Sequence, residues 1–167
     1  APTTTATPTT TTEAPEVGPS QGGSASLAIE AEATGLRPWE DTCSSPCYNM
    51  MNAVYDKLTE QYEDGSYGPM LATSWESNDD FTVWTVQIQD GVTFTDGTPL
   101  TAQTIADMFV VQQTGAASAG VIASSNLIAV EATGDHEVTY TLSATNGPFM
   151  SVLSRAPMGM VFNPALV

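Results

Sequence analysis

The chain has 167 residues and a formal net charge of −16, because 19 acidic residues stand against only 3 basic ones. A surface with this excess of negative charge repels phosphate backbones and anionic lipid headgroups, which argues against nucleic acid as a partner. The length suits about one domain with its own core, and no apolar run approaches the roughly 20 residues that span a bilayer.

The first 24 residues differ in composition from the rest of the chain. They are rich in threonine and proline and almost lack large apolar side chains. Because such a segment cannot bury enough surface to offset its ordering entropy, residues 1–24 are predicted to be a disordered tether. We expect it to belong to an exported protein, periplasmic or at the cell surface, held as a lipoprotein. The alternative is a low-complexity tail in another compartment.

The two cysteines follow a short predicted strand. Residues 26–31 alternate apolar and polar side chains, which predicts an opening strand, and a loop then carries Cys43 and Cys47. An even cysteine count in an exported protein favours a disulfide between them. A zinc site would need more ligands than the distant His136 supplies, and redox pairs are usually spaced by two residues.

Residues 48–58 are predicted to form a helix. Its buried face would hold four apolar residues at helical spacing: Met51, Val54, Tyr55 and Leu58. The polar, glycine-containing segment 61–69 is predicted to be a turn.

Residues 71–109 indicate a strand, turn, strand, turn, helix unit. Trp84, Val86 and Ile88 alternate with polar residues, as in a half-buried strand. Two Asp-Gly pairs, at 90–91 and 96–97, supply the positive φ that tight turns need.

The helix of this unit is predicted to start at an N-cap, Thr101. Thr104 occupies the place where Glu or Gln would complete a capping box, so we expect a weak start. The buried face would consist of four residues: Ala102, Ile105, Ala106 and Phe109.

The later part of the chain reads as a loop and a hairpin. Residues 114–125 are small and lack a clear period, which fits a loop or a loosely packed helix. Residues 126–133 and 137–142 alternate and predict two strands joined by a turn. His136 lies on that turn, which favours solvent exposure over catalysis.

The order of these residues resembles the extracellular solute-binding proteins of family 5, the peptide, oligopeptide and nickel receptors of ATP-driven importers. Those proteins carry a P-x-L-A-x-S-W segment, a strand, D-G-V-x-F-x-D-G-x-P-L-T-A and a helix. The matching residues here are Pro69, Leu71, Ala72, Ser74, Trp75, Asp90, Gly91, Val92, Phe94, Asp96, Gly97, Pro99, Leu100, Thr101 and Ala102.

The resemblance implies an α/β fold of the periplasmic-binding-protein type II kind. Residues 25–167 would be the N-terminal part of its first lobe, a mixed sheet with flanking helices. Receptors of this family are much longer, so the second lobe, and with it a complete cleft, would be absent from this chain.

The resemblance also implies ligand contacts. In family members, the residues that enter the helix corresponding to 48–58 face the ligand. The resemblance therefore implies that Trp39, Tyr48 and Asn49 are ligand contacts. The segment that returns to the ligand would contribute Arg155, Met158 and Met160. Aromatic and methionine side chains also pack in cores, so that alternative stays open.

Arg37 stands where the family turn usually has an acid. It would either anchor a ligand carboxylate in a bidentate fashion or form a surface ion pair.

The function implied is solute capture: peptides or other small solutes bound outside the membrane and passed to an ABC permease. We expect a monomer that needs no cofactor or metal and is not an enzyme. The competing hypotheses are a one-lobe interaction module and a carboxylate-based glycosidase. Asp90 and Asp96 each precede a turn glycine, where Asp ordinarily bonds its own backbone, which argues against the glycosidase.

Overall fold

The computed structural model describes residues 22–24, 26–42 and 44–167. Its elements in chain order are α1 (Ser45–Asn52), β1 (Thr59–Gln61), β2 (Tyr67–Pro69), β3 (Ala72–Ser77), β4 (Val83–Ile88), α2 (Ala102–Thr114), α3 (Ala119–Ser125), β5 (Leu127–Ala132), β6 (Glu137–Leu142) and two short 3-10 helices, η1 (Phe149–Ser151) and η2 (Pro164–Leu166). Apart from residues 22–24, the predicted tether lies outside the described residues.

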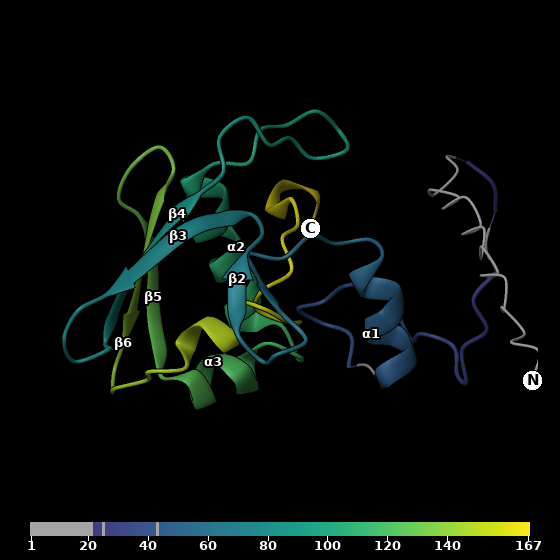
Figure 1. The fold of residues 1–167 in the computed structure, drawn as a ribbon, viewed down its shortest axis with the longest axis horizontal. Helices are drawn as coiled ribbons and strands as arrows, with labels where there is room; N and C mark the ends of the chain where they lie inside the picture. The colour runs from purple at the N-terminus through teal and green to yellow at the C-terminus, as the bar shows by residue number, and fades with distance from the viewer. Residues whose placement is uncertain (1–21, 25, 43) are drawn as a thin grey trace, which may run out of the picture.

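A four-stranded sheet in the order β3-β4-β6-β5 forms the larger half of the fold, and β1 and β2 pair as a separate hairpin. In Figure 1 the four-stranded sheet lies on one side of the β1–β2 hairpin, with α2 behind the sheet, and α1 lies on the other side of the hairpin. Each strand pairing is antiparallel, so the described residues contain no parallel pair of the expected mixed sheet.

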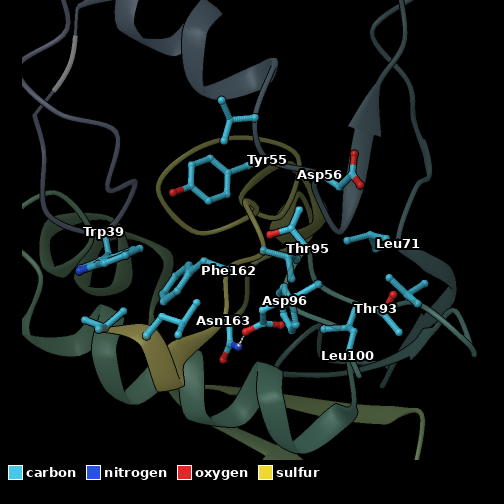
Figure 2. Close-up of a pocket in the computed structure, with 16 residues that line it drawn as sticks. Trp39, Tyr55, Asp56, Leu71, Thr93, Thr95, Asp96, Leu100, Phe162 and Asn163 are labelled. Atoms are coloured by element: carbon cyan, nitrogen blue, oxygen red, sulfur yellow. Dashed lines mark hydrogen bonds between the residues drawn. The ribbon is translucent and has the colours of Figure 1, made fainter. Parts of the chain in front are cut away.

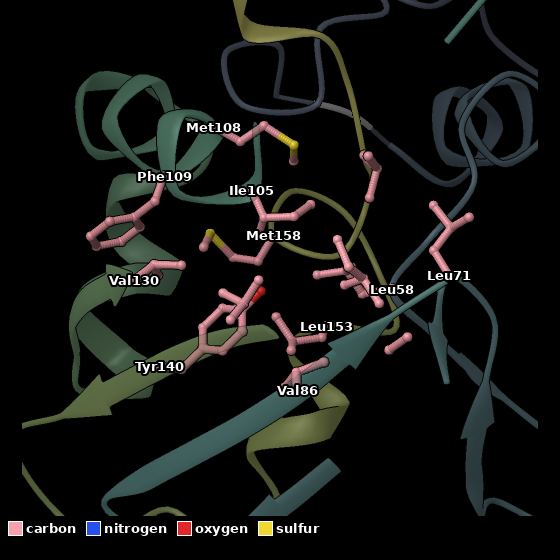
Figure 3. Close-up of a cluster of buried hydrophobic side chains, with 14 of the residues drawn as sticks. Leu58, Leu71, Val86, Ile105, Met108, Phe109, Val130, Tyr140, Leu153 and Met158 are labelled. Atoms are coloured by element: carbon pink, nitrogen blue, oxygen red, sulfur yellow. The ribbon is translucent and has the colours of Figure 1, made fainter. Parts of the chain in front are cut away.

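The main core lies between the sheet and α2. Ile105, Met108 and Phe109 of α2 face Val86 and Tyr140 of the sheet (Figure 3). Leu153 and Met158, from the chain after η1, fill the space between them. Amphipathic elements thus bury one face each, and the C-terminal segment completes the packing.

The predicted strand–turn–helix unit is present. Trp84, Val86 and Ile88 are buried on alternate positions of β4. Gly91 and Gly97 have φ of 74° and 85°, the left-handed conformation that the two turns require. The predicted hairpin is present too, as β5 and β6.

The start of α2 is better capped than the sequence suggested. Thr101 accepts a hydrogen bond from the backbone N–H of Thr104, and the Thr104 hydroxyl in turn accepts one from the N–H of Thr101 at 3.3 Å. A threonine therefore completes the capping box that we expected only from Glu or Gln. The prediction of a weak start was wrong.

Two other predictions fail because tertiary contacts decide these segments. Residues 26–31 form no strand, and Leu27 is 80% exposed. A strand needs a partner, and the backbone of this segment makes no hydrogen bond to another described residue.

The α1 helix is shifted relative to its prediction of 48–58, since it begins at Ser45 and ends at Asn52. Met51 and Leu58 are buried as expected, whereas Val54 is 61% exposed. After the helix, Leu58 donates its N–H to the Gly159 carbonyl (2.9 Å), a strand-like contact that helical spacing cannot reveal.

The remaining segments were left open or missed. Residues 114–125 contain the short helix α3, and the predicted turn 61–69 contains the β1–β2 hairpin. In the part of the chain that the structure describes, no helix has both the length and the apolar character to cross a membrane.

Candidate functional site

One hollow gathers polar side chains at the meeting point of α1, β1 and the segment that follows η1. We call it the basic hollow; its volume is about 550 Å³, and its lining residues are Tyr48, Asn52, Lys57, Gln61, Ser154, Arg155, Ala156 and Met160. This size lies in the range of small-ligand sites.

Local structure explains how these side chains come together. Tyr48 and Asn52 are four residues apart on α1 and therefore share one face of it. Lys57 and Met160 form an antiparallel bridge, so two segments about a hundred residues apart in sequence lie side by side. The Gly159 N–H donates to the Arg155 carbonyl at 2.7 Å, which closes the loop carrying Arg155.

The charges in the basic hollow are largely uncompensated. Arg155 is exposed and makes no ion pair with another described residue. The Lys57 Nζ lies 3.8 Å from Glu60 Oε1, at the edge of ion-pair distance, and the Glu60 side chain is 47% exposed. At this distance, and with Glu60 open to solvent, the pair neutralises Lys57 only in part. The hollow can therefore offer cationic donors to a ligand.

Arg37 is differently placed. Its Nη2 lies 3.2 Å from Asp41 Oδ1, and the Arg37 side chain is 61% exposed. Side-chain and backbone hydrogen bonds from Arg37 hold the pKa of Asp41 below its usual value. Of the two readings of Arg37, the surface ion pair is the one that the structure contains.

A second cavity, of about 440 Å³, lies under the C-terminal residues (Figure 2). Trp39 and Phe162 stack on one side of it, with ring centroids 4.0 Å apart and an interplanar angle of 31°. Asn163 donates to the carboxylate of Asp96 at 2.9 Å, as the dashed line in Figure 2 marks. We call this the aromatic cavity.

Asp96 has a structural role in its turn. The Thr98 hydroxyl and N–H donate to Asp96 Oδ1 at 2.6 and 2.9 Å, and these bonds lower the pKa of Asp96. A lowered folded-state pKa contributes stability that is present above the ordinary value of 3.8 and is lost as the pH falls through the folded-state pKa. We predict that Asp96→Asn lowers the melting temperature at pH 7.

The same variant should differ less from the parent chain at acid pH, since protonated Asp96 has already lost this advantage. Thermal melts at pH 7 and at about pH 3 measure both differences. A gap that is equal at both pH values would contradict the assignment.

The six predicted ligand contacts divide into two groups. The basic hollow brings together Tyr48, Arg155 and Met160. The other three lie elsewhere: Trp39 and Met158 belong to the main core, and Asn49 lines a shallow hollow with residues 27–30.

The predicted disulfide remains a prediction, because Cys43 lies outside the described residues. Cys47 is 1% exposed and packs with Met51 and Met160, which places it directly behind the basic hollow.

His136 lies on the predicted turn, and its side chain is partly exposed, at 38%. Its Nε2 is 3.2 Å from Asp90 Oδ1. Within residues 22–24, 26–42 and 44–167, no three His, Cys, Asp or Glu side chains are grouped so that they could hold a metal ion.

Sequence reasoning missed Asn52, Lys57 and Gln61 as members of the hollow. Lys57 carried a signal, since it is one of only three basic residues in the chain. Its neighbour Met160, however, is about a hundred residues away in sequence, and only the fold brings the two together.

Comparison with known proteins agrees with this architecture. Residues 66–165 match the sequence pattern described as bacterial extracellular solute-binding proteins, family 5 Middle. The chain is 30% identical over 119 residues to the probable D,D-dipeptide-binding periplasmic protein of Escherichia coli, which is 68% of this chain and 22% of that protein. It is 31% identical to the nickel-binding periplasmic protein of the same organism over 102 residues, 60% of this chain and 20% of that one.

Solved structures show the same fold. The murein tripeptide-binding protein MppA of Escherichia coli superposes with a TM-score of 0.73 at 21% identity, over 80% of this chain and 30% of that one. NikA from Brucella suis, solved with Fe(III)-EDTA, superposes with a TM-score of 0.67 at 22% identity, over 81% of this chain and 28% of NikA.

These matches confirm the predicted α/β fold of type II periplasmic binding proteins, and the chain covers 28% and 30% of these two structures. The chain spans between 14% and 22% of the length of the curated relatives that it matches. The pattern match covers more than half of its residues, and the chain therefore belongs to the bacterial extracellular solute-binding proteins of family 5.

Proposed function

We propose that the chain is part of the substrate-binding component of an ABC importer, which captures peptides or related small solutes outside the membrane and delivers them to the permease. The observation that carries the proposal is the basic hollow, where Tyr48, Arg155 and Met160 meet. Two of these three lie in the segment that matches the family.

The relatives support this class of ligand. Two of them are named for dipeptides and murein peptides, and one for nickel, and all three are called periplasmic. We accordingly propose an exported, periplasmic or surface location, residues 1–24 as a tether, and residues 25–167 as part of the first lobe of a monomeric receptor.

The chemistry of the basic hollow suits the end of a peptide. Arg155 offers a planar set of donors that matches a carboxylate, and Tyr48 adds a hydroxyl. Met160 gives the hollow a polarizable apolar wall that adapts to different side chains. In a two-lobed receptor, such a surface holds the ligand while hinge closure covers it.

The two aspartates that a glycosidase would use as catalytic acids both have side-chain partners, which favours a binding function. Asp96 is engaged by Thr98 and Asn163, and Asp90 lies beside His136 on a turn. The second candidate is a one-lobe interaction module without transport activity.

The test is calorimetric titration of the protein at its full natural length with di- and tripeptides, beside the variant Arg155→Gln. We expect binding to the parent protein and an affinity about 10- to 100-fold lower in the variant, the loss of a charge-assisted hydrogen bond. Arg37→Gln serves as the matched control and should bind as the parent does, because Arg37 is paired with Asp41.

Absence of any peptide binding would contradict the transport proposal and favour the one-lobe module. Equal affinity in the parent protein and Arg155→Gln would remove Arg155 from the site while leaving solute binding in place.

A further inference from the structure

Positive charge in this protein is concentrated in one place. The chain has 3 basic and 19 acidic residues. The eight residues that line the basic hollow include two of the three basic ones, Lys57 and Arg155, and none of the acidic ones. With 19 acids and 3 bases in the chain, eight residues chosen at random would on average include more acids than bases.

Neither cation of the hollow has a close carboxylate partner among the described residues. Arg155 has no carboxylate within ion-pair distance among the described residues, in contrast to Arg37, which is held by Asp41. Lys57 has only the long contact to Glu60, and Glu60 does not line the hollow. Arg155 is therefore open to a ligand carboxylate, and Lys57 has one long ion pair that a ligand carboxylate can supplement or replace.

Lys57 is also held in position. Its backbone N–H points to Met70 Sδ at 3.3 Å, and its carbonyl accepts the Leu71 N–H at 3.1 Å. The bridge to Met160 holds it from the other side, and its side chain is only 15% exposed. These contacts fix the backbone at position 57, so the side chain starts from a rigid base beside the hollow.

We propose that the basic hollow selects small anions with two or more carboxylates, and that Lys57 adds the second cationic contact to that of Arg155. This inference rests on the proposed function and specifies its substrate class. One carboxylate meets the Arg155 guanidinium and another the Lys57 ammonium. The hydroxyl of Tyr48 and the amide of Gln61 supply hydrogen bonds around them.

The two cations of the basic hollow also determine which peptides should bind weakly. A zwitterionic peptide with one carboxylate satisfies only one of the two cations, and a cationic peptide places a like charge beside Lys57 and Arg155. Since specificity is a difference of affinities, the second cation discriminates against both. Acidic peptides and non-peptide polycarboxylates share the chemistry that fits.

The test is titration of the full-length protein with three probes: the dipeptide Glu-Glu, the dipeptide Ala-Ala, and tricarballylate, a tricarboxylate without a peptide bond. We expect Glu-Glu to bind about 10-fold or more tightly than Ala-Ala. Lys57→Met keeps the aliphatic stem and removes the charge, so it should abolish most of this preference and weaken Glu-Glu binding far more than Ala-Ala binding. Lys57→Arg is the charge-retaining control and should keep the preference.

The outcomes separate the inference from the function on which it rests. Comparable affinities for Glu-Glu and Ala-Ala, or an unchanged preference in Lys57→Met, would overturn the anion selectivity while peptide binding stands. Binding of no probe at all would overturn both. Binding of Glu-Glu alone identifies acidic peptides as the source of the anion, and binding of tricarballylate as well extends it to polycarboxylates; both results support the inference.

Discussion

Phe149→Ala should lower the free energy of unfolding by about 3–5 kcal/mol, the usual cost of removing a fully buried phenylalanine. Phe149 is completely buried, and its ring centroid lies 5.4 Å from that of Tyr140 and 6.0 Å from that of Trp84. The truncation therefore leaves a void between η1 and the sheet and removes two aromatic contacts. For a chain of this size, the melting temperature should fall by roughly 6–20 °C.

Urea denaturation at constant m-value measures this loss. Val110→Ala is the matched control, because Val110 is 62% exposed on α2 and should change the stability by less than about 0.5 kcal/mol. Equal effects of the two substitutions would mean that Phe149 is not at the centre of the core.

Gly159→Ala should also destabilise the protein. A Cβ atom at position 159 would overlap the carbonyl oxygen of Leu153 and come within 2.9 Å of the Arg155 backbone nitrogen. Because both obstacles are backbone atoms, the loop from Leu153 to Gly159 must shift, and overpacking of this kind costs about 1–3 kcal/mol. The loop carries Arg155, so the shift should also weaken peptide binding.

Gly120→Ala is the control for the glycine itself. Nothing lies within 4 Å of a Cβ at this position of α3, so the substitution should stabilise the protein by about 0.5–1 kcal/mol. Chemical denaturation combined with calorimetry compares both variants. A Gly159→Ala protein with parental stability and affinity would show that this loop tolerates movement and does not position Arg155.

The sequence predicted well where local pattern and final environment coincide. The alternation of Trp84, Val86 and Ile88 determines which face of β4 is buried, and the Asp-Gly pairs determine the turns around it. The register of the sheet follows from the same alternation, since a slip by one residue would expose these three side chains.

The basic hollow was only half predictable. Tyr48, Arg155 and Met160 were designated by resemblance, but nothing local shows that Lys57 lies beside Met160. The helical spacing of Val54 and Leu58 was misleading, because α1 ends at Asn52 and Leu58 bonds instead to the loop at Gly159. Long-range pairing of irregular segments leaves no period in the sequence.

Trp39 shows the opposite difficulty. An aromatic residue at the entrance of a predicted site suits both a ligand contact and a core position. In the structure it stacks on Phe162 and accepts hydrogen bonds from Ala117 and Ser118 at its carbonyl, so it connects α3 to the C-terminal segment. Only the position of Phe162, more than a hundred residues away, decides between the two roles.

The most direct measurement of the central claim is hydrogen–deuterium exchange of the full-length protein with and without a peptide that binds in calorimetry. We predict that the ligand slows exchange in α1, in residues 57–61 and in residues 154–160, the three segments that line the basic hollow. Protection confined to residues 92–96 and 161–167, around the aromatic cavity, would contradict the assignment of the site to the basic hollow.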